Sequence, residues 1–334
     1  MSEIRQDPTT KEWVILATAR GKRPSDFAQR VLRPEKPAFV TTCPFCPGNE
    51  SMTPHAVLSY RGDSNDISWQ VRAFANDYPA VTPGGGSLRK TKQQLFLTLD
   101  GIGCHEVIVE NPIHNTHLAL MNDFEVAEVL RAYKERYEAA VQKPFVKAAF
   151  VFKNHGRGAG TSLDHPHSQV IATSVVPRHT IMLYEVATAY YADNGRCLYS
   201  DVMERELESG TRIIMNTEKF IVFHPFASYR PFETWIMPKA NQAIFNQISL
   251  EDIRDLAQVV RITLMKLYHG LDDPDYNIVI DSAPVGEERA ELYRWHIRII
   301  PRLTEAAGFE IGSGIFINPA LPEDTARFMR ELKV

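Results

Sequence analysis

Two segments of the chain repeat one pattern at an offset of 127 residues, which points to an internal duplication. Glu106 and Glu233 each begin an apolar, strand-like run that leads to a proline and then to a loop. Asn122 and Ser249 follow as candidate N-caps of amphipathic helices. We therefore interpret the chain as a tandem duplication. A chance likeness between two strand-loop-helix segments is the alternative interpretation.

The spacing of apolar residues predicts the fold class. After the two caps, apolar side chains recur at helical spacing at Phe124, Ala127, Leu130, Tyr133 and Tyr137, and at Ile253, Leu256, Val260, Leu264 and Leu267, where Gly270 is expected to end the helix. Further runs typical of strands are 148–152, 169–172, 212–215, 220–223, 276–280 and 296–300. The pattern predicts an α+β fold, an antiparallel sheet with one long helix per repeat. Pro177 and the polar stretch 192–196 suggest two domains, 1–180 and 181–334.

The composition excludes several classes of protein. The 334 residues are 44% hydrophobic and 23% charged, which is typical of a globular protein with a sizeable core. A formal charge of −4 and a pI of about 6.3 argue against a nucleic-acid partner. The N-terminus lacks the features of a secretory signal, and no apolar run approaches the roughly 18 residues that span a bilayer. We expect a cytoplasmic protein that does not contact membranes.

Cys43 and Cys46 form a Cys-x2-Cys pair, which can present two thiolates on one turn at the spacing of a zinc site. Two more ligands must come from elsewhere in the fold. The candidates in the first half are His105, His114, His117, His155, His165 and His167. A redox pair or two packed thiols are the alternatives.

The second repeat has lost part of this candidate metal site. The sequence comparison aligns Cys43-x-x-Cys46 with Cys197-x-x-Ser200, His114 with Asn241, and His165-Pro-His167 with His296-Ile-Arg298. Cys46 and His114 then have no metal-binding counterpart in the second half, while Cys43 and His165 align with Cys197 and His296. Such a difference is expected if an ancestral metal site was duplicated and the second copy then lost ligands.

The segment His165-Pro-His-Ser-Gln169 carries the most chemistry. In an extended strand, His165 and His167 lie on the same face, so one imidazole can bind metal while the other acts on a substrate. A neutral imidazole can attack phosphorus, and the glycine-rich loop 156–160 together with Ser162 can donate hydrogen bonds to phosphate oxygens. By itself a His-x-His pair is equally typical of zinc ligands or of packed surface residues.

These motifs together resemble the galactose-1-phosphate uridylyltransferase family, the transferase branch of the histidine-triad (HIT) superfamily. The segments that carry the resemblance are Asp7–Trp13, Arg20–Pro24, Cys43–Cys46, Phe74–Pro79, His105–Glu110, Asn154–Ser162, His165–Gln169 and Gly308–Asn318. The resemblance covers nearly the whole chain. It implies two HIT-like repeats, a homodimer with sites near the subunit interface, and a ping-pong exchange of a nucleoside monophosphate.

The resemblance also implies roles for individual residues. It assigns Cys43, Cys46, His114 and His165 to a structural zinc ion, and it makes His167 the nucleophile that attacks the α-phosphorus of a nucleoside diphosphate sugar. Gln169 would hydrogen-bond the phosphoryl group, Ser162 and Asn154 would hold the phosphates, Arg20 and Arg23 would neutralise them, and Asn76 and Asp77 would lie by the ribose and base. Because the amide of Gln169 does not titrate, it cannot activate water as a histidine could, and the covalent intermediate would persist until a sugar phosphate arrives.

Three departures from the best-known family members affect the expected substrate. Ser168 replaces a glycine, as in plant members that act as ADP-glucose phosphorylases; His296-Ile-Arg298 replaces a His-x-His pair of an additional iron site; and 308–316 differs from the usual hexose-contacting segment. We expect no iron site. The first hypothesis is exchange between UDP-glucose and galactose 1-phosphate. Alternatives are an ADP-glucose phosphorylase, a dinucleoside polyphosphate phosphorylase, or a non-catalytic, zinc-stabilised nucleotide-binding protein.

Overall fold

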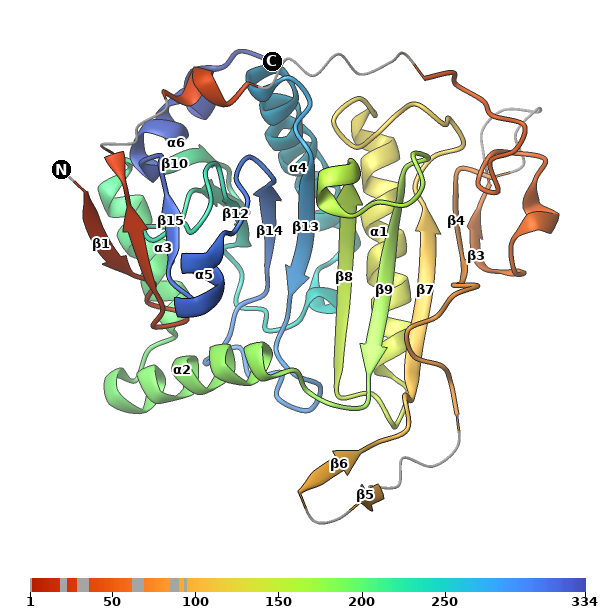
Figure 1. The fold of residues 1–334 in the computed structure, drawn as a ribbon, viewed down its shortest axis with the longest axis horizontal. Coiled ribbons are helices and arrows are strands. Elements are labelled where there is room, and N and C mark those ends of the chain that lie inside the picture. Colours follow the sequence, from red (N-terminus) through yellow and green to blue (C-terminus); the bar gives the residue numbers. More distant parts are fainter. Residues whose placement is uncertain (1, 19–22, 29–35, 62–68, 85–89, 93–94) are drawn as a thin grey trace.

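A computed structural model describes residues 2–18, 23–28, 36–61, 69–84, 90–92 and 95–334 (Figure 1). The strands are β1 (Glu3–Gln6), β2 (Trp13–Leu16), β3 (Ala56–Tyr60), β4 (Val71–Ala75), β5 (Lys90–Lys92), β6 (Phe96–Thr98), β7 (Gly103–Val109), β8 (Ala148–His155), β9 (His167–Thr173), β10 (Ile213–Asn216), β11 (Phe220–Phe223), β12 (Thr234–Pro238), β13 (Tyr276–Asp281), β14 (His296–Pro301) and β15 (Phe316–Asn318). The α-helices are α1 (Asp123–Val141), α2 (Arg178–Asn194), α3 (Leu198–Ser209), α4 (Leu250–Leu271), α5 (Gly308–Ser313) and α6 (Pro322–Glu331).

A ten-stranded antiparallel sheet forms the centre of the structure. Its strand order is β10-β11-β12-β14-β13-β8-β9-β7-β4-β3, and β8 of the first half pairs directly with β13 of the second. Helices α1 and α4 pack against each other and against one face of this sheet, where they share a single apolar core (Figure 1). The predicted α+β duplication with one long helix per repeat is therefore confirmed, and the two repeats share one continuous sheet.

Both predicted helix caps form. The Asn122 side chain accepts a hydrogen bond from the Glu125 amide at 2.9 Å, and the Glu125 carboxylate accepts one from the Asn122 amide at 2.8 Å. The Ser249 hydroxyl accepts a hydrogen bond from the Asp252 amide at 3.0 Å. The prediction that Gly270 ends the second helix is wrong, because α4 continues to Leu271.

Gly270 has a packing role inside the last turn of α4. A Cβ atom at this position would collide with the Phe328 and Leu332 side chains, which come from α6 and its C-terminal end. The glycine therefore lets α6 approach α4 closely.

Helices α2 and α3 were not predicted from the sequence. The expected domain boundary at residue 180 lies in the first turn of α2, and α2 and α3 cover the second half with a separate apolar cluster. Strands β1 and β2, which the sequence analysis assigned to the first domain, form a three-stranded sheet with β15 from the end of the chain. The N-terminal strands thus pack beside the C-terminal half.

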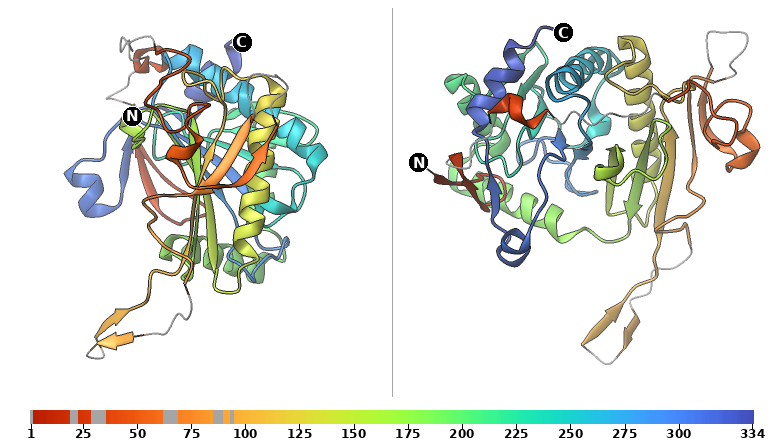
Figure 2. Two further views of the ribbon diagram at one scale, coloured as in Figure 1. Left: turned by 90° about the vertical axis from the view of Figure 1, so that its right-hand side faces the viewer. Right: turned by 45° about the horizontal axis from the view of Figure 1, so that its top comes forward.

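The β5–β6 hairpin projects away from the rest of the structure (Figures 1 and 2). It carries exposed apolar side chains at Leu95, Phe96 and Leu97. No helix among the described residues has the length and apolar character needed to cross a membrane.

Candidate active site and metal centre

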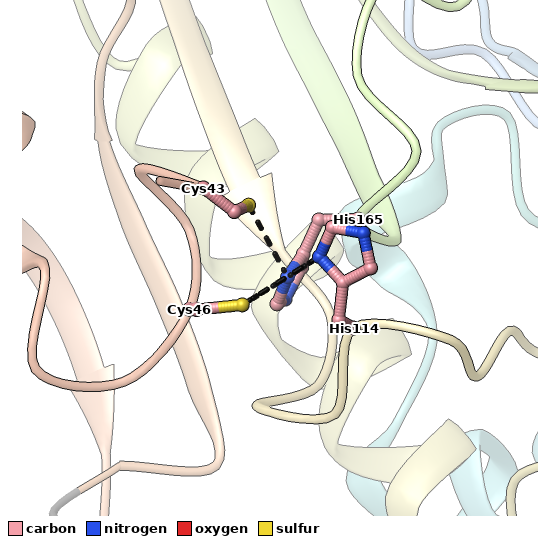
Figure 3. A group of neighbouring side chains, drawn as sticks. All are labelled: Cys43, Cys46, His114 and His165. Atoms are coloured by element: carbon pink, nitrogen blue, oxygen red, sulfur yellow. Dashed lines mark hydrogen bonds between the residues drawn. The ribbon is translucent and has the colours of Figure 1, made fainter. Parts of the chain in front are cut away.

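Cys43, Cys46, His114 and His165 converge beside the start of β9 (Figure 3). The Cys46 Sγ atom lies 3.5 Å from His114 Nδ1 and 3.6 Å from His165 Nδ1, and the two Nδ1 atoms are 3.3 Å apart. A tetrahedral zinc ion bound at ordinary distances separates its sulfur and nitrogen ligands by about 3.6 Å and two nitrogens by about 3.3 Å. The four side chains that the sequence analysis selected therefore have the geometry of a tetrahedral metal site.

Hydrogen bonds orient two of these ligands, His165 and Cys46, and anchor the loop that carries His114. His165 Nε2–H donates a hydrogen bond to the Asn111 carbonyl at 2.7 Å, so the Nδ1 lone pair of His165 faces the cysteines. The Val40 amide donates to Cys46 Sγ at 3.4 Å. The Asn111 side chain donates to Glu125 at 3.0 Å, which connects the loop that carries His114 to the cap of α1.

The electrostatics of the site favour a bound cation. Burial raises the pKa of Cys43, so its thiolate form needs a positive charge nearby. Burial also lowers the pKa of His165 to about 4, which keeps this imidazole neutral at physiological pH. Two neutral imidazoles and two thiolates form a donor set that zinc prefers.

His167 is the first residue of β9 and has one ring nitrogen available for chemistry. Its Nδ1–H donates to the His165 carbonyl at 2.8 Å, which leaves Nε2 as the nitrogen with a lone pair. The side chain is only 7% exposed, and burial lowers its pKa. His167 does not belong to the group of four candidate metal ligands. It lines a cavity of about 230 Å³ together with His165 and Asn154.

A buried charged network lies beneath His167 and was missed by the sequence analysis. Lys153 Nζ donates to Glu110 at 2.6 Å and to the His167 carbonyl at 3.3 Å. The Ser168 hydroxyl donates to Glu110 at 2.5 Å, and the Tyr133 hydroxyl donates to the same carboxylate at 2.7 Å. Burial raises the pKa of Glu110. The Lys153 ammonium and the hydrogen bonds from Ser168 and Tyr133 together lower this pKa by more, so the net shift is downward.

Two sequence signals could have indicated buried charges here, although not which residues pair. Lys153 is a charged residue in an otherwise apolar strand, and Glu110 directly follows the apolar run of β7. Buried charges of this kind need a partner, which often comes from a neighbouring strand.

Gln169 is held by a histidine that the sequence analysis considered only as a metal ligand. The Ala80 amide donates to His105 Nδ1 at 3.1 Å, so His105 Nε2 carries the proton and lies 2.7 Å from Gln169 Oε1. The Nδ2 atom of the Asn76 side chain lies 3.1 Å from His105 Nε2. This arrangement fixes the Gln169 oxygen on His105 and leaves the Gln169 amino group as a donor for a ligand.

Asn154 connects the glycine loop to the second half of the chain. Asn277 Nδ2 donates to Asn154 Oδ1 at 2.8 Å and to the Ala159 carbonyl at 2.9 Å, while the Gly158 amide donates to Asp275 at 2.6 Å. Gly156 has a φ of 81°, and a Cβ atom there would collide with the Asp275 carboxylate, so only glycine fits.

Four other predicted residues remain: Arg20, Arg23, Ser162 and Asp77. Arg20 is outside the described residues. Arg23 is exposed and borders a separate cavity with Pro319 and Asp324. Ser162 and Asp77 are exposed, and neither lines the His167 cavity. The candidate metal ligands Cys43, Cys46, His114 and His165 thus lie beside the His167 cavity, which Asn154 also lines, and His105 links Gln169 to Asn76.

The second half has a counterpart of His167, and it differs from the one that the sequence comparison selected. His296 begins β14, and its Nδ1–H donates to the Arg294 carbonyl at 3.2 Å, as His167 does to His165. His165 therefore corresponds to Arg294, and the alignment of His165 with His296 is wrong by two residues. The offset between the repeats is not constant along the chain, because the segments that connect their strands differ in length.

Arg294 occupies the place of a metal ion in the second half. Its guanidinium donates to Ser200 Oγ at 2.8 Å and to Asn241 Oδ1, the counterparts of Cys46 and His114. Two carbonyl oxygens, of Pro238 and Lys239, accept further bonds at 2.8 and 2.6 Å. A covalently attached cation thus holds the segments that a metal would hold in the first half.

Arg298 occupies the Gln169 position of the second repeat. It pairs with Asp281 through two hydrogen bonds of 2.5 and 3.2 Å and donates to the Tyr229 hydroxyl at 2.9 Å. This guanidinium already neutralises Asp281 beside His296, so these residues do not suit the additional iron site discussed above.

Comparisons with known proteins cover nearly the whole chain. Residues 1–177 match the N-terminal domain of galactose-1-phosphate uridyl transferase, and residues 184–318 match its C-terminal domain. The ADP-glucose phosphorylase of Arabidopsis thaliana is 34% identical over 99% of this chain and 93% of its own length. The galactose-1-phosphate uridylyltransferase of Thermotoga maritima is 29% identical over 100% and 99% of the two chains.

A crystal structure of an ADP-glucose phosphorylase from Arabidopsis thaliana with bound ADP-glucose superposes with a TM-score of 0.83, covers 100% of both chains and is 31% identical. Since the two family models together match most of the sequence, the chain belongs to the galactose-1-phosphate uridyl transferase family and is a nucleotidyltransferase of that family.

Proposed function

We propose that the protein transfers a nucleoside monophosphate from a nucleoside diphosphate sugar through a covalent intermediate on His167. The observation that carries this proposal is the hydrogen bond from His167 Nδ1–H to the His165 carbonyl, which directs the Nε2 lone pair away from the metal ligands. Nε2 attacks the α-phosphorus, the Nε2–P bond forms, and the P–O bond to the sugar phosphate breaks. A phosphate oxygen of the acceptor then attacks phosphorus, and the Nε2–P bond breaks.

The surrounding residues suit the two half-reactions. We propose that the Gln169 amino group and the Asn154 amide donate to phosphoryl oxygens, with Asn76 and Asp77 near the nucleoside. Ser162, Arg20 and Arg23 remain proposed phosphate contacts. For Ser162, the loop that follows β8 would have to rearrange around the ligand, and the arginines could instead reach the site of a second subunit. The amide of Gln169 offers water no general base, which favours transfer over hydrolysis.

The role proposed for zinc is structural. Cys43, Cys46, His114 and His165 would hold the ion, and its charge would neutralise the two buried thiolates. The ion would also fix the His165 backbone, whose carbonyl sets the tautomer of His167.

Two versions of the reaction differ in base and acceptor. We place ADP-glucose and inorganic phosphate first, because the relative named ADP-glucose phosphorylase is 34% identical over 99% of this chain. The exchange of UDP-glucose with galactose 1-phosphate, the first hypothesis from sequence, is the second candidate. It is supported by the 29% identity to the Thermotoga maritima uridylyltransferase.

The test is retention of label from ADP-glucose or UDP-glucose carrying a radioactive α-phosphate. We expect acid-labile label on the wild-type protein and none on His167→Gly, with His269→Gln, an exposed histidine on α4, as the matched control. The nucleotide that labels the protein identifies the base. Label retained on His167→Gly would exclude His167 as the nucleophile, and no label from either nucleotide would favour a non-catalytic protein.

A further inference from the structure

A second group of metal-binding side chains lies beside the His167 cavity and has no role in the proposed reaction. It consists of His117 in the loop before α1, His155 at the end of β8, and Asp273 after α4. One ligand atom from each residue lies within 4.8 Å of the other two. His155 Nε2 is 2.9 Å from Asp273 Oδ1, and His117 Nε2 is 3.8 Å from the same oxygen.

His117 is a buried imidazole that lacks a hydrogen bond within the described part of the chain. Its side chain is 8% exposed, its Nδ1 is buried without a partner, and the 3.8 Å from Nε2 to Asp273 is too long for a hydrogen bond. A buried polar group without a partner is costly. Coordination of a metal ion by Nε2 would give this ring one partner, with the imidazole proton on Nδ1.

Aromatic packing holds both imidazoles in position. The His155 ring stacks on Tyr276 with centroids 4.6 Å apart and an angle of 20° between the planes, and the His117 ring lies 5.3 Å from Tyr268. The two histidine rings are 4.8 Å apart. Ligands that come from three different segments and are fixed by packing are preorganised for a small ion.

The charge balance allows a cation here. Lys153, the nearby ammonium, is neutralised by Glu110 at 2.6 Å, while Asp273 contributes a carboxylate to the group itself. Burial lowers the pKa of His117 to about 3, so this imidazole is neutral and keeps a lone pair for a metal. Metal binding at His155 Nε2 would require the tautomer of this imidazole that carries its proton on Nδ1.

We propose that His117, His155 and Asp273 bind one divalent transition-metal ion such as zinc, separate from the ion at the Cys43 site. Two imidazole nitrogens and one carboxylate are a known donor set for zinc and for Fe²⁺, and they leave at least one coordination position open. All three residues line the same cavity of about 230 Å³ as His167 and Asn154, so the open position faces the space that a phosphorylated ligand would enter. Water or a phosphoryl oxygen would complete the coordination. This site does not depend on the proposed reaction.

The test is a titration of the metal-depleted full-length protein with Co²⁺, followed by absorbance. Cobalt bound by thiolates gives an intense sulfur-to-metal band, whereas cobalt bound by two imidazoles and a carboxylate gives only weak visible bands. We expect two equivalents in the wild type, and one equivalent with an unchanged sulfur band in His155→Gln and in Asp273→Asn. The exposed His55→Gln is the matched control and should bind two equivalents.

One equivalent in the wild type would overturn the proposal, as would two equivalents in both variants. His117→Gln provides a third variant if either of the others fails to fold, which near-ultraviolet circular dichroism detects. Because the readout is metal stoichiometry, an inactive enzyme that binds two ions would refute the proposed reaction and leave this site intact.

Discussion

Single buried side chains fix both the reactivity and the stability of this chain, and Glu110 is the clearest case. It accepts hydrogen bonds from Lys153, Ser168 and Tyr133 in the interior. Glu110→Gln would leave the Lys153 ammonium buried without a counter-charge, and we expect it to lower the free energy of unfolding by about 3–5 kcal/mol. Urea denaturation measures this, with Glu138→Gln on the exposed face of α1 as the control, for which we expect a change below ~1 kcal/mol. An equal effect of the two substitutions would contradict the role of Glu110.

Glu233 should give the stability a pH dependence of its own. It is fully buried, and burial raises its pKa from 4.5 to about 7 despite the nearby Arg298. The protonated form is therefore favoured in the folded state, so its stabilising contribution is complete below about pH 4.5 and is lost as the pH rises to about 7. Glu233→Gln should abolish this decline, and the unfolding free energies of variant and wild type, measured from pH 5 to 8, should diverge as the pH rises. Parallel profiles would show that Glu233 is ionised in the folded protein.

Among the secondary-structure elements, β12, β14 and α3 meet at Arg294. The guanidinium bonds to Ser200, Asn241 and two carbonyl oxygens, and the Arg294 side chain itself is buried. Arg294→Met should leave the buried Pro238 carbonyl unpaired and remove the links to Ser200, Asn241 and Lys239, and we expect it to destabilise the chain by about 2–4 kcal/mol. The exposed Arg205→Met is the control, with less than ~1 kcal/mol expected. If denaturation of the two variants were indistinguishable, Arg294 would not join these elements.

A metal ion bound by Cys43, Cys46, His114 and His165 would join elements of the first half in the same way. Cys46→Ser should lower the bound metal by one equivalent and lower the thermal midpoint, since the Cys43 loop, the His114 loop and the start of β9 are then no longer held together. Cys197→Ser, at the position in the second repeat that corresponds to Cys43, should leave the metal content unchanged. Elemental analysis and calorimetry provide the two readouts. Unchanged metal content in Cys46→Ser would exclude this site.

At the scale of the whole molecule, we propose a homodimer. The proposal is supported by the β5–β6 hairpin, which projects from the structure (Figure 2) and exposes the apolar side chains of Leu95, Phe96 and Leu97. Light scattering should report twice the 37.9 kDa chain mass, and Leu97→Glu should shift the mass toward the monomer. Val334→Glu, a change at the exposed C-terminus, is the control. A monomeric wild type would refute the proposal.

The sequence predicted features that local chemistry and periodicity encode. The helix stripes after Asn122 and Ser249 were confirmed as α1 and α4, and the Cys-x2-Cys pair led to a buried metal group that the structure contains. The pairing of Lys153 with Glu110 was not predictable, because these residues meet only when β8 and β7 lie on either side of β9. The place of Arg294 was missed for a related reason, since no short motif shows that a guanidinium can substitute for a metal ion.

The central claim is that His167 Nε2 accepts the nucleotide. The most direct measurement is the intact mass of the protein after incubation with ADP-glucose or UDP-glucose without acceptor, followed by peptide mapping. The account predicts a mass increase of one nucleoside monophosphate, located on the peptide that contains His167 and absent from His167→Gly. An adduct on any other residue, or no adduct with either nucleotide, would contradict it.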